Sequence, residues 1–425
     1  MHLKAASAII IGLAAASASA LPKTPEWWKP KSWSNPTQQR FRTAELGPRP
    51  QFLVTDMEEG WLKDKLRSCS DAVARPSQFS IGHRGGACLQ FPEETRESAE
   101  AGMRMGAGIL ECDVAFTSDR QLVCRHDQCD LHTTTNIVAT ALGAKCTTPF
   151  AAADGNGTAA SAYCCTSDIT LAEFKSLCGK MDGYNASATT PEDYLRGTPA
   201  WRTDLYATCG TVLAHKEFLE LVDSRGRDFT TELKQPRVPM PFDGNYTQEV
   251  YAQQVIDEYR AAGIDPSRVW LQSFSFADVA YWLRADPAFG KQAVLLDQSG
   301  DTPGTFPAAV ANLSFYKEAG VQVIAPPLQY LVSLGENNEY VPSSYATAAK
   351  KLGFKILTWS LERSGPLAQA AAAGDYYYST ITNGTHRDGD MYRLIDVLAR
   401  QVGVQGIFSD WSATVTYYAN CFNIF

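Results

Sequence analysis

The stretch ILECDVAFTSDRQLVCRHD, residues 109–127, decides which fold we expect of this chain. It holds two apolar runs separated by only a handful of turn residues. A parallel crossover needs about a dozen residues or more, so the two runs should form an antiparallel hairpin. Because side chains alternate along a strand, Glu111 and Asp113 point one way and Cys112 points the other. We expect Cys112 in packing or in a disulfide.

Working outward from this hairpin, the chain alternates short apolar runs with helical patterns such as 247–263 and 343–353. This alternation predicts parallel βα units. A doubly wound open sheet is the competing architecture, but eight strands are what a closed (β/α)8 TIM barrel needs. A further helix is expected over 52–67. The eight predicted strands are 79–85, 108–114, 228–234, 269–274, 293–298, 321–327, 354–361 and 406–411.

Residues 128–227 do not follow this rhythm and predict a disulfide-rich insertion after the hairpin of the second strand. No CxxC…CxxC spacing is present, so disulfides are expected rather than a zinc site. The insertion's six cysteines allow fifteen pairings, and the odd total of eleven leaves at least one thiol free or intermolecular. Barrel active sites lie in the loops after the strands, so the insertion should wall the pocket. Its cysteines are Cys129, Cys146, Cys164, Cys165, Cys178 and Cys209.

The N-terminus, MHLKAASAIIIGLAAASASALP, predicts a signal peptide over residues 1–20. Its apolar part is shorter than the roughly 20 residues that a membrane anchor needs. Residues 21–78 are expected to form an arm and a helix, and residues 79–425 the barrel. We expect a secreted, extracellular protein, either held in a cell wall or free to diffuse. Five N-x-S/T sequons predict a glycoprotein, at Asn156, Asn185, Asn245, Asn312 and Asn383.

Composition limits the partners of the chain. Its 45% hydrophobic and 20% charged residues are typical of a folded globular protein. A net charge of −8 argues against nucleic acid and anionic membranes as partners. No later segment predicts stable membrane insertion. We therefore expect a small-molecule substrate, and a monomer or a weak homo-oligomer.

Acids gather at the predicted strand ends. Glu111 and Asp113 share a face near the end of one strand, and Glu232 shares a face with Lys234 at the end of the next. Salt bridges with arginines would explain any one of these acids alone. Three converging carboxylates instead favour a divalent cation, and oxygen ligands predict Ca²⁺ or Mg²⁺.

Two of the six histidines, His83 and His126, also stand at strand ends. Phosphodiester hydrolysis needs one group to accept a proton and another to donate one, and histidine can do either near neutral pH. Arg84 offers a planar cationic fork that suits phosphate oxygens. Gly85 and Gly86 allow a ligand to approach the backbone closely.

Together these motifs resemble the glycerophosphodiester phosphodiesterase family, which shares its barrel with phosphatidylinositol-specific phospholipases C and sphingomyelinase D-like enzymes. The resemblance spans roughly 79–127 and 228–411, and the ordered set is far more specific than any single motif. A long insertion after the HD motif also occurs in some members. The motifs are HRGG-x5-PEET, ECDVAFTSD, LVCRHD, TTELK and GIFSDW.

The resemblance implies a role for each matching residue. The histidines would be the general acid–base pair, and the three acids would bind the metal. Arg84 and Lys234 would contact phosphate, Glu93 would support the site, and Trp359 is expected to pack against the glycerol. Glu94 replaces the family's usual Asn in PENT, and TWSLE at 358–362 replaces TW-x-x-N. Both departures bear on substrate preference.

The expected function is hydrolysis of substrates such as glycerophosphocholine or glycerophosphoinositol to sn-glycerol 3-phosphate and an alcohol. His83 is assigned as the base, although the two histidine roles could be exchanged. The nucleophile stays open between water and the glycerol 2-hydroxyl. Two alternatives remain: a phospholipase D-like enzyme acting on sphingolipid or lysolipid, and a non-catalytic glycoprotein that binds a lipid headgroup or glycan.

Overall fold

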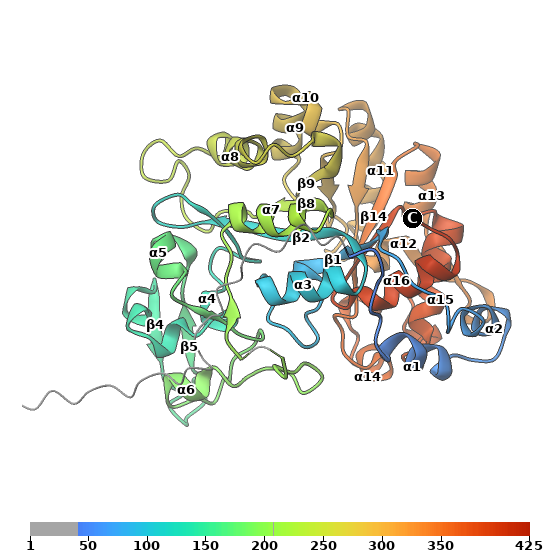
Figure 1. Cartoon of the computed structure of the whole chain (residues 1–425), viewed down its shortest axis with the longest axis horizontal. Helices are drawn as coiled ribbons and strands as arrows, with labels where there is room; N and C mark the ends of the chain where they lie inside the picture. The colour runs from blue at the N-terminus through green and yellow to red at the C-terminus, as the bar shows by residue number, and fades with distance from the viewer. Residues whose placement is uncertain (1–40, 207) are drawn as a thin grey trace, which may run out of the picture. The chain divides into compact units, whose positions relative to one another are not determined.

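The computed structural model describes residues 41–206 and 208–425, and within them eight parallel strands form a closed barrel. Closure occurs because the first strand pairs with both the second and the last (Figure 1). The (β/α)8 barrel is therefore confirmed over the open sheet. In order around the barrel the strands are β1 (Ser77–Gly82), β2 (Ala107–Phe116), β8 (Asp228–Leu233), β9 (Val269–Ser273), β10 (Val294–Leu296), β11 (Val323–Ala325), β14 (Lys355–Leu361) and β15 (Gly406–Ser409).

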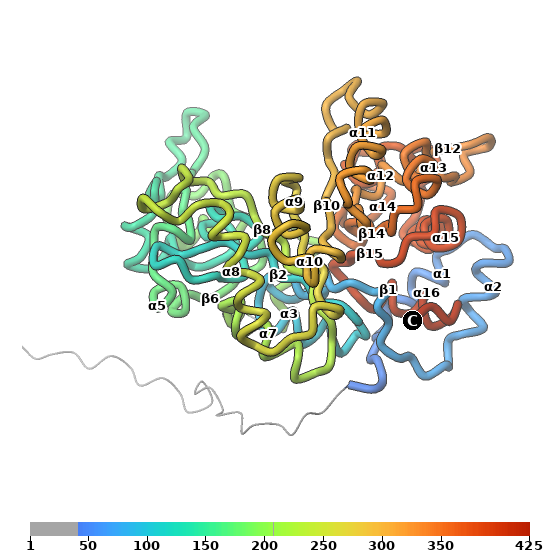
Figure 2. The backbone as a smooth tube through the Cα atoms, turned by 90° about the horizontal axis from the view of Figure 1, so that it is seen from above, coloured from blue at the N-terminus to red at the C-terminus, as the bar shows by residue number. Residues whose placement is uncertain are grey.

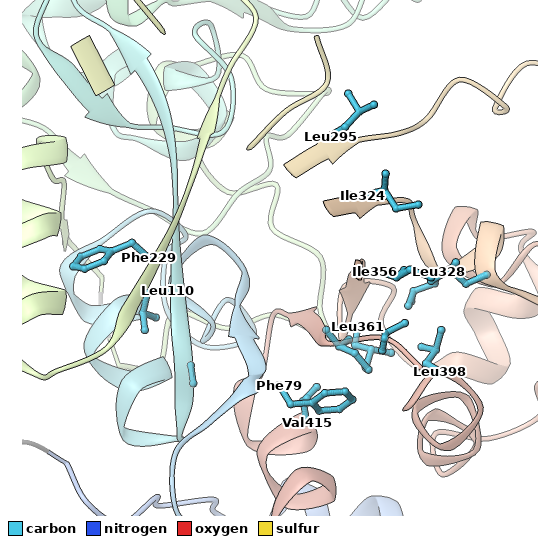
Figure 3. Close-up of a cluster of buried hydrophobic side chains, with 14 of the residues drawn as sticks. Phe79, Leu110, Phe229, Leu295, Ile324, Leu328, Ile356, Leu361, Leu398 and Val415 are labelled. Atoms are coloured by element: carbon cyan, nitrogen blue, oxygen red, sulfur yellow. The ribbon is translucent and has the colours of Figure 1, made fainter. Parts of the chain in front are cut away.

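Alternation along the strands divides the apolar side chains into two layers. One small cluster, which includes Ile81, Ile109 and Phe408, fills the barrel interior. The larger cluster lies between the strands and the surrounding helices, where Figure 3 shows Leu110 and Phe229 with other outward-facing side chains. Glu111 and Asp113 share the parity of Ile109, so β2 carries its acids on the interior face.

The predicted hairpin is confirmed. Strand β3 (Leu122–Cys124) runs antiparallel to β2, with Val114 opposite Cys124. Cys112 faces the outer layer and forms a disulfide with Cys124 across the hairpin. The long second strand is thereby joined to the short segment that leads to His126.

The helix expected over 52–67 is wrong as a single element. The structure has α1 (Arg49–Asp56) and α2 (Trp61–Arg67), separated by a turn. Met57 takes an extended conformation, and so does Gly60, which precedes α2. The break lets Leu53 and Val54 of α1 and Leu66 of α2 all pack into the same core.

The helices that follow the barrel strands match the predicted pattern, including the two expected over 247–263 and 343–353. A two-stranded hairpin, β12 (Val332–Leu334) and β13 (Tyr340–Pro342), lies between α12 and α13. The helices are α3 (Arg96–Arg104), α7 (His215–Ser224), α8 (Gln248–Ala261), α9 (Phe276–Ala285), α10 (Pro287–Gly290), α11 (Phe306–Glu318), α12 (Leu328–Leu331), α13 (Ser344–Lys351), α14 (Leu367–Ala372), α15 (Asp390–Asp396) and α16 (Ser412–Cys421).

The insertion has short elements and a core of its own, which includes Leu131, Phe174 and Tyr194. Its six cysteines pair among themselves, as Cys129–Cys165, Cys146–Cys164 and Cys178–Cys209. In both Figure 1 and Figure 2 it lies on the opposite side of the barrel from α13 and α15. Its elements are α4 (Leu131–Thr134), β4 (Thr148–Ala151), β5 (Ser161–Tyr163), α5 (Leu171–Phe174), β6 (Cys178–Gly179), α6 (Pro191–Tyr194) and β7 (Gly210–Thr211).

A fifth disulfide, Cys69–Cys421, joins the segment after α2 to the last helix. Cys88 is buried and is the free cysteine of the described chain, which accounts for the odd total. The predicted signal peptide and most of the predicted arm, residues 1–40, lie outside the described residues. Among the described helices, none has the length and apolar character needed to cross a membrane.

Candidate active site

A cavity of about 930 Å³ opens at the carboxyl ends of the barrel strands, where active sites of this fold lie. Seven of the nine residues predicted from sequence line it. The other two, Asp113 and Glu93, are buried against lining residues. The seven are His83, Arg84, Glu111, His126, Glu232, Lys234 and Trp359.

Three buried carboxylates converge at one side of the cavity. Glu111, Asp113 and Glu232 have oxygen atoms within 4.8 Å of one another, since Asp113 and Glu232 are register partners on neighbouring strands. Burial raises the pKa of Glu111, and Asp113 and Glu232 raise it further. Burial also raises the pKa of Glu232 to about 8, although Lys234 opposes that shift. Such a group is stable in the charged form only beside a cation.

The donor set fits a divalent cation. Neither oxygen of Asp113 has a hydrogen-bond partner among the described residues, although both are buried. The Arg84 Nε lies 3.7 Å from Asp113 Oδ2, but a buried carboxylate without hydrogen bonds is still costly, and coordination would lower that cost. Hard cations such as Ca²⁺ and Mg²⁺ take oxygen ligands of this kind. Glu111, Asp113 and Glu232 are therefore the residues that could hold one.

His83 is held by residues from the last strands of the barrel. Its Nδ1 lies 2.5 Å from Asp410 Oδ1 and 2.9 Å from Ser360 Oγ, and its Nε2 lies 3.7 Å from Glu111 Oε2. Gly82 of β1 is the register partner of Ser409 of β15, so the residues that follow them meet at the barrel end. Burial lowers the pKa of His83 to about 4, with Asp410 opposing the shift.

His126 stands on the loop after β3 and lines the same cavity, half-buried. Burial lowers its pKa well below the usual value, and the positive charges of Arg84 and Lys234 lower it further. The free protein therefore carries a neutral His126 at neutral pH. An anion bound beside it would oppose the repulsion from the two cations.

The turn after β1 aims Arg84 at the acids. Arg84 adopts a left-handed conformation with φ of 51°, and its backbone N–H donates to Glu111 Oε2 at 2.9 Å. Its guanidinium donates to Glu93 Oε1 at 2.8 Å, while its buried Nε lies 3.7 Å from Asp113 Oδ2 and has no hydrogen-bond partner among the described residues. Glu93 thus orients the arginine that faces the cavity.

Three residues that contact the site were not predicted from the sequence: Asp410, Arg363 and Arg202. Arg363 donates to Asp410 at 2.8 Å and to Glu93 at 3.3 Å. Arg202 comes from the insertion and also donates to Asp410. Asp410 could have been noticed as a strand-end acid in GIFSDW, whereas no local pattern marks Arg202.

Lys234 and Trp359 lie on the cavity wall. The Lys234 ammonium is 2.6 Å from Glu232 Oε1 and 5.9 Å from the centre of the Phe274 ring. The indole N–H of Trp359 donates to Ala325 O at 2.8 Å, which fixes the ring at the cavity edge. One cationic and one apolar contact are therefore available to a substrate.

The two residues that depart from the family pattern, Glu94 and Glu362, lie in different environments. Glu94 is buried, and its carboxylate accepts the backbone N–H of Asp113 at 3.2 Å. Burial raises its pKa well above the usual value, and Asp113 and Glu111 raise it further. Glu362 instead forms an ion pair with Arg49 of α1 at 2.7 Å and is not among the cavity-lining residues.

Sequence comparison finds relatives of this chain among known proteins. A relative from Arthroderma benhamiae, named "Extracellular protein", is 56% identical over 245 residues, which is 57% of this chain and the whole of that protein. A Mycobacterium tuberculosis protein named "Probable glycerophosphodiester phosphodiesterase 1" is 37% identical over 59 residues, 14% of this chain and 21% of that protein.

The fold has a counterpart among solved structures. A crystal structure from Silicibacter pomeroyi DSS-3 superposes with a TM-score of 0.52 at 20% identity, covering 82% of this chain and 96% of the other. The model of the glycerophosphoryl diester phosphodiesterase family matches residues 83–414, which include every site residue named above. The chain therefore belongs to the glycerophosphoryl diester phosphodiesterase family and is an enzyme of that family.

Proposed function

We propose that this chain is a secreted, divalent-cation-dependent enzyme that hydrolyses glycerophosphodiesters to sn-glycerol 3-phosphate and an alcohol. The single observation that carries the proposal is that two histidines and a cluster of three carboxylates share one cavity. Family membership supports the reaction class. The name of the Mycobacterium tuberculosis relative points the same way.

In this proposal Glu111, Asp113 and Glu232 hold the cation, Ca²⁺ or Mg²⁺. When bound, the cation supplies Lewis-acid stabilisation of charge that develops on the phosphoryl group. Arg84 and Lys234 add fixed positive charge around the phosphate and cost little reorganisation during the reaction. Trp359 packs against the apolar face of the glycerol.

His83 is suited to the role of base. Asp410 accepts the Nδ1 proton, which leaves Nε2 with a free lone pair, and the low pKa keeps the ring neutral at neutral pH. It takes a proton from the attacking oxygen while that oxygen bonds to phosphorus. The attacking oxygen belongs to water, or to the glycerol 2-hydroxyl in a route through a cyclic phosphate that is then hydrolysed.

His126 is suited to the role of acid once substrate is bound. The negative phosphodiester offsets the charges of Arg84 and Lys234 and so favours protonation of the ring. As the bond between phosphorus and the alcohol oxygen breaks, His126 gives its proton to that oxygen. The two histidines together conserve the proton count of hydrolysis.

Separate observations support the location and the organisation in this proposal. Five disulfides are typical of an oxidising compartment, and the Arthroderma benhamiae relative is named as extracellular. Within this proposal residues 1–20 are a signal peptide, 21–78 an arm and helical segment, and 79–425 the barrel with its insertion over 128–227. The enzyme acts as a monomer or a weak homo-oligomer, and glycans are carried at the sequons.

The decisive experiment is release of glycerol 3-phosphate from glycerophosphocholine and glycerophosphoinositol by the purified mature protein, with and without EDTA. We expect release that EDTA abolishes and that Ca²⁺ or Mg²⁺ restores. Release that ignores EDTA would remove the cation from the proposal. No release from either substrate, with choline freed from sphingomyelin or from a choline lysolipid instead, would contradict the glycerophosphodiester assignment.

A further inference from the structure

We propose that Arg202, a residue of the disulfide-rich insertion, is a positioning residue for the reaction. It fixes the carboxylate of Asp410, and Asp410 in turn orients His83. The inference rests on the proposed phosphodiesterase function. It assigns the insertion a direct part in the reaction centre, because the insertion supplies one link of a chain of three side chains that ends on a reacting group.

The contacts that carry this proposal are buried. Arg202 is 7% exposed, and one of its terminal nitrogens donates to Asp410 Oδ2 while the other lies 3.8 Å from Glu93 Oε2. The other carboxylate oxygen of Asp410, Oδ1, forms the hydrogen bond with His83 Nδ1. Oδ2 of Asp410 thus accepts from the arginines, and Oδ1 contacts the imidazole.

The charge balance of this group depends on Arg202. Two buried carboxylates, Glu93 and Asp410, are surrounded by Arg84, Arg363 and Arg202. Of these two acids, Arg84 forms a hydrogen bond with Glu93 and none with Asp410, whereas Arg363 divides its hydrogen bonds between both. Without Arg202, the Oδ2 atom of Asp410 keeps only the shared Arg363. Removing one partner from a buried ion cluster is costly. The carboxylate of Asp410, held by fewer hydrogen bonds, would then be free to move.

The insertion holds Arg202 in place through several contacts. The guanidinium stacks over the neighbouring Trp201 ring at 4.8 Å, and the N–H of Thr203 donates to Leu89 O at 3.0 Å. Trp201 also packs against the barrel loop that carries Arg363, since a Cβ on Gly365 would stand 2.9 Å from its ring. Trp201 therefore fits only against a glycine at this point of the loop.

The loop that delivers Arg202 is closed covalently. Cys178 and Cys209 bracket it with a disulfide, and the strands at its two ends, β6 and β7, pair with each other. This closure limits the conformations that the loop can take when it is released from the barrel. The disulfide therefore serves the position of Arg202 as well as the stability of the insertion.

The test is a kinetic comparison of wild type, Arg202→Met and Arg202→Lys on glycerophosphocholine. A displaced base slows the chemical step, and misplacement of about 1 Å can cost about a hundredfold in rate. We therefore expect Arg202→Met to lower kcat strongly with little change in KM, and Arg202→Lys to recover part of the loss. Arg196→Met is the matched control, because Arg196 lies on the same loop and is largely exposed.

A double-mutant cycle with Asp410→Asn separates positioning from a merely structural role. If Arg202 acts through Asp410, the double variant should be no slower than Asp410→Asn alone. Additive losses would overturn the proposal, and so would an Arg202→Met enzyme with wild-type kcat. If Arg202→Met does not fold, Arg202→Gln takes its place in the cycle with the same criteria.

Failure of this inference can be told apart from failure of the proposed function. An active wild type with an unaffected Arg202 variant overturns only the role of Arg202. A folded wild type that releases no glycerol 3-phosphate from any glycerophosphodiester overturns both. Melting temperatures of all variants, measured alongside the kinetics, show whether a lost activity reflects a lost fold.

Discussion

The imidazole of His83 and the carboxylate of Asp410 lie 2.5 Å apart, although 327 positions separate them in the chain. The contact exists because the barrel closes between its first and last strands, β1 and β15. It fixes which nitrogen of His83 faces the cavity. The consequence is that a residue near the C-terminus orients a histidine near the start of the barrel, the one that we propose as the base.

We expect Asp410→Asn to lower kcat/KM by about 10²–10⁴-fold, the contribution typical of a general acid–base group. An amide at this position can present its N–H to Nδ1 and favour the wrong tautomer of His83. The measurement is steady-state hydrolysis of glycerophosphocholine. Asp193→Asn, at a partly exposed position of the insertion, should leave the rate unchanged. A loss below tenfold for Asp410→Asn would contradict the role given to it.

His83→Ala and His126→Ala should each reduce kcat by about 10²-fold or more, because each removes one of two proton-transfer groups. His132→Ala serves as the control, since His132 is a half-buried histidine of the insertion that does not line the cavity. The variants are compared at saturating substrate and cation. The two-histidine scheme is wrong if His126→Ala keeps more than a tenth of wild-type activity.

Ca²⁺ or Mg²⁺ should raise the melting temperature of wild type and not that of Asp113→Asn. A ligand that binds only the folded state at a hundred times its Kd stabilises that state by about 2.7 kcal/mol. Differential scanning calorimetry in EDTA and in each cation makes the comparison. Asp243→Asn, at an exposed carboxylate that does not line the cavity, should keep the response of wild type. Equal stabilisation of Asp113→Asn would remove Asp113 from the ligand set.

The cation-free protein should lose stability as pH rises from about 6.5 to 8. Burial raises the folded-state pKa of Glu232 to about 8, against an ordinary value of 4.5. The folded state therefore binds a proton that the unfolded state has released, and the free energy of unfolding falls as pH rises through this window. His83, with a folded pKa of about 4, acts with the opposite sign, but only below its unfolded value of 6.5.

Thermal unfolding in EDTA at pH 6.5, 7.2 and 8 measures this slope. Glu232→Gln should reduce the slope, because the amide does not titrate, while Glu111 and Glu94 retain raised pKa values. Saturating Ca²⁺ or Mg²⁺ should flatten it as well, since coordination keeps the carboxylates ionised. A wild-type slope of the opposite sign, with stability increasing up to pH 8 in EDTA, would contradict the buried carboxyl cluster as the dominant titrating group.

Thiol titration should find one reactive cysteine, and only after unfolding. Cys88 is fully buried, and burial raises the pKa of its thiol, so the native protein has almost no accessible thiolate. Native protein should therefore not react with a thiol reagent over minutes. Denatured protein with its disulfides intact should react with one equivalent of the thiol reagent per chain. Rapid labelling of native protein would show that Cys88 is exposed or that a disulfide is open.

The strands and the carboxylate cluster could be predicted because they depend on local patterns. Glu111, Asp113 and Glu232 lie at alternating positions near strand ends, and parallel strands bring such positions to one end of a barrel. The hairpin followed from a turn too short for a crossover. These inferences needed only periodicity and connection length.

The pairing of Asp410 with His83 and the entry of Arg202 into the site could not be predicted, because both depend on long-range packing. Asp410 meets His83 only when the barrel closes, and Arg202 enters from an insertion with no periodic pattern. The cysteine pairings depend on how that insertion folds. The break between α1 and α2 reflects tertiary packing of Leu53 and Leu66, which overrides a helical pattern that looks continuous in sequence.

The Cys69–Cys421 disulfide changes what a single proteolytic cleavage does to the chain. Together with the peptide backbone it makes residues 69 to 421 a covalent ring that contains every barrel strand. A single proteolytic nick inside this ring yields a linearised chain rather than two fragments. Such a nicked molecule therefore retains all eight strands in one covalently connected piece.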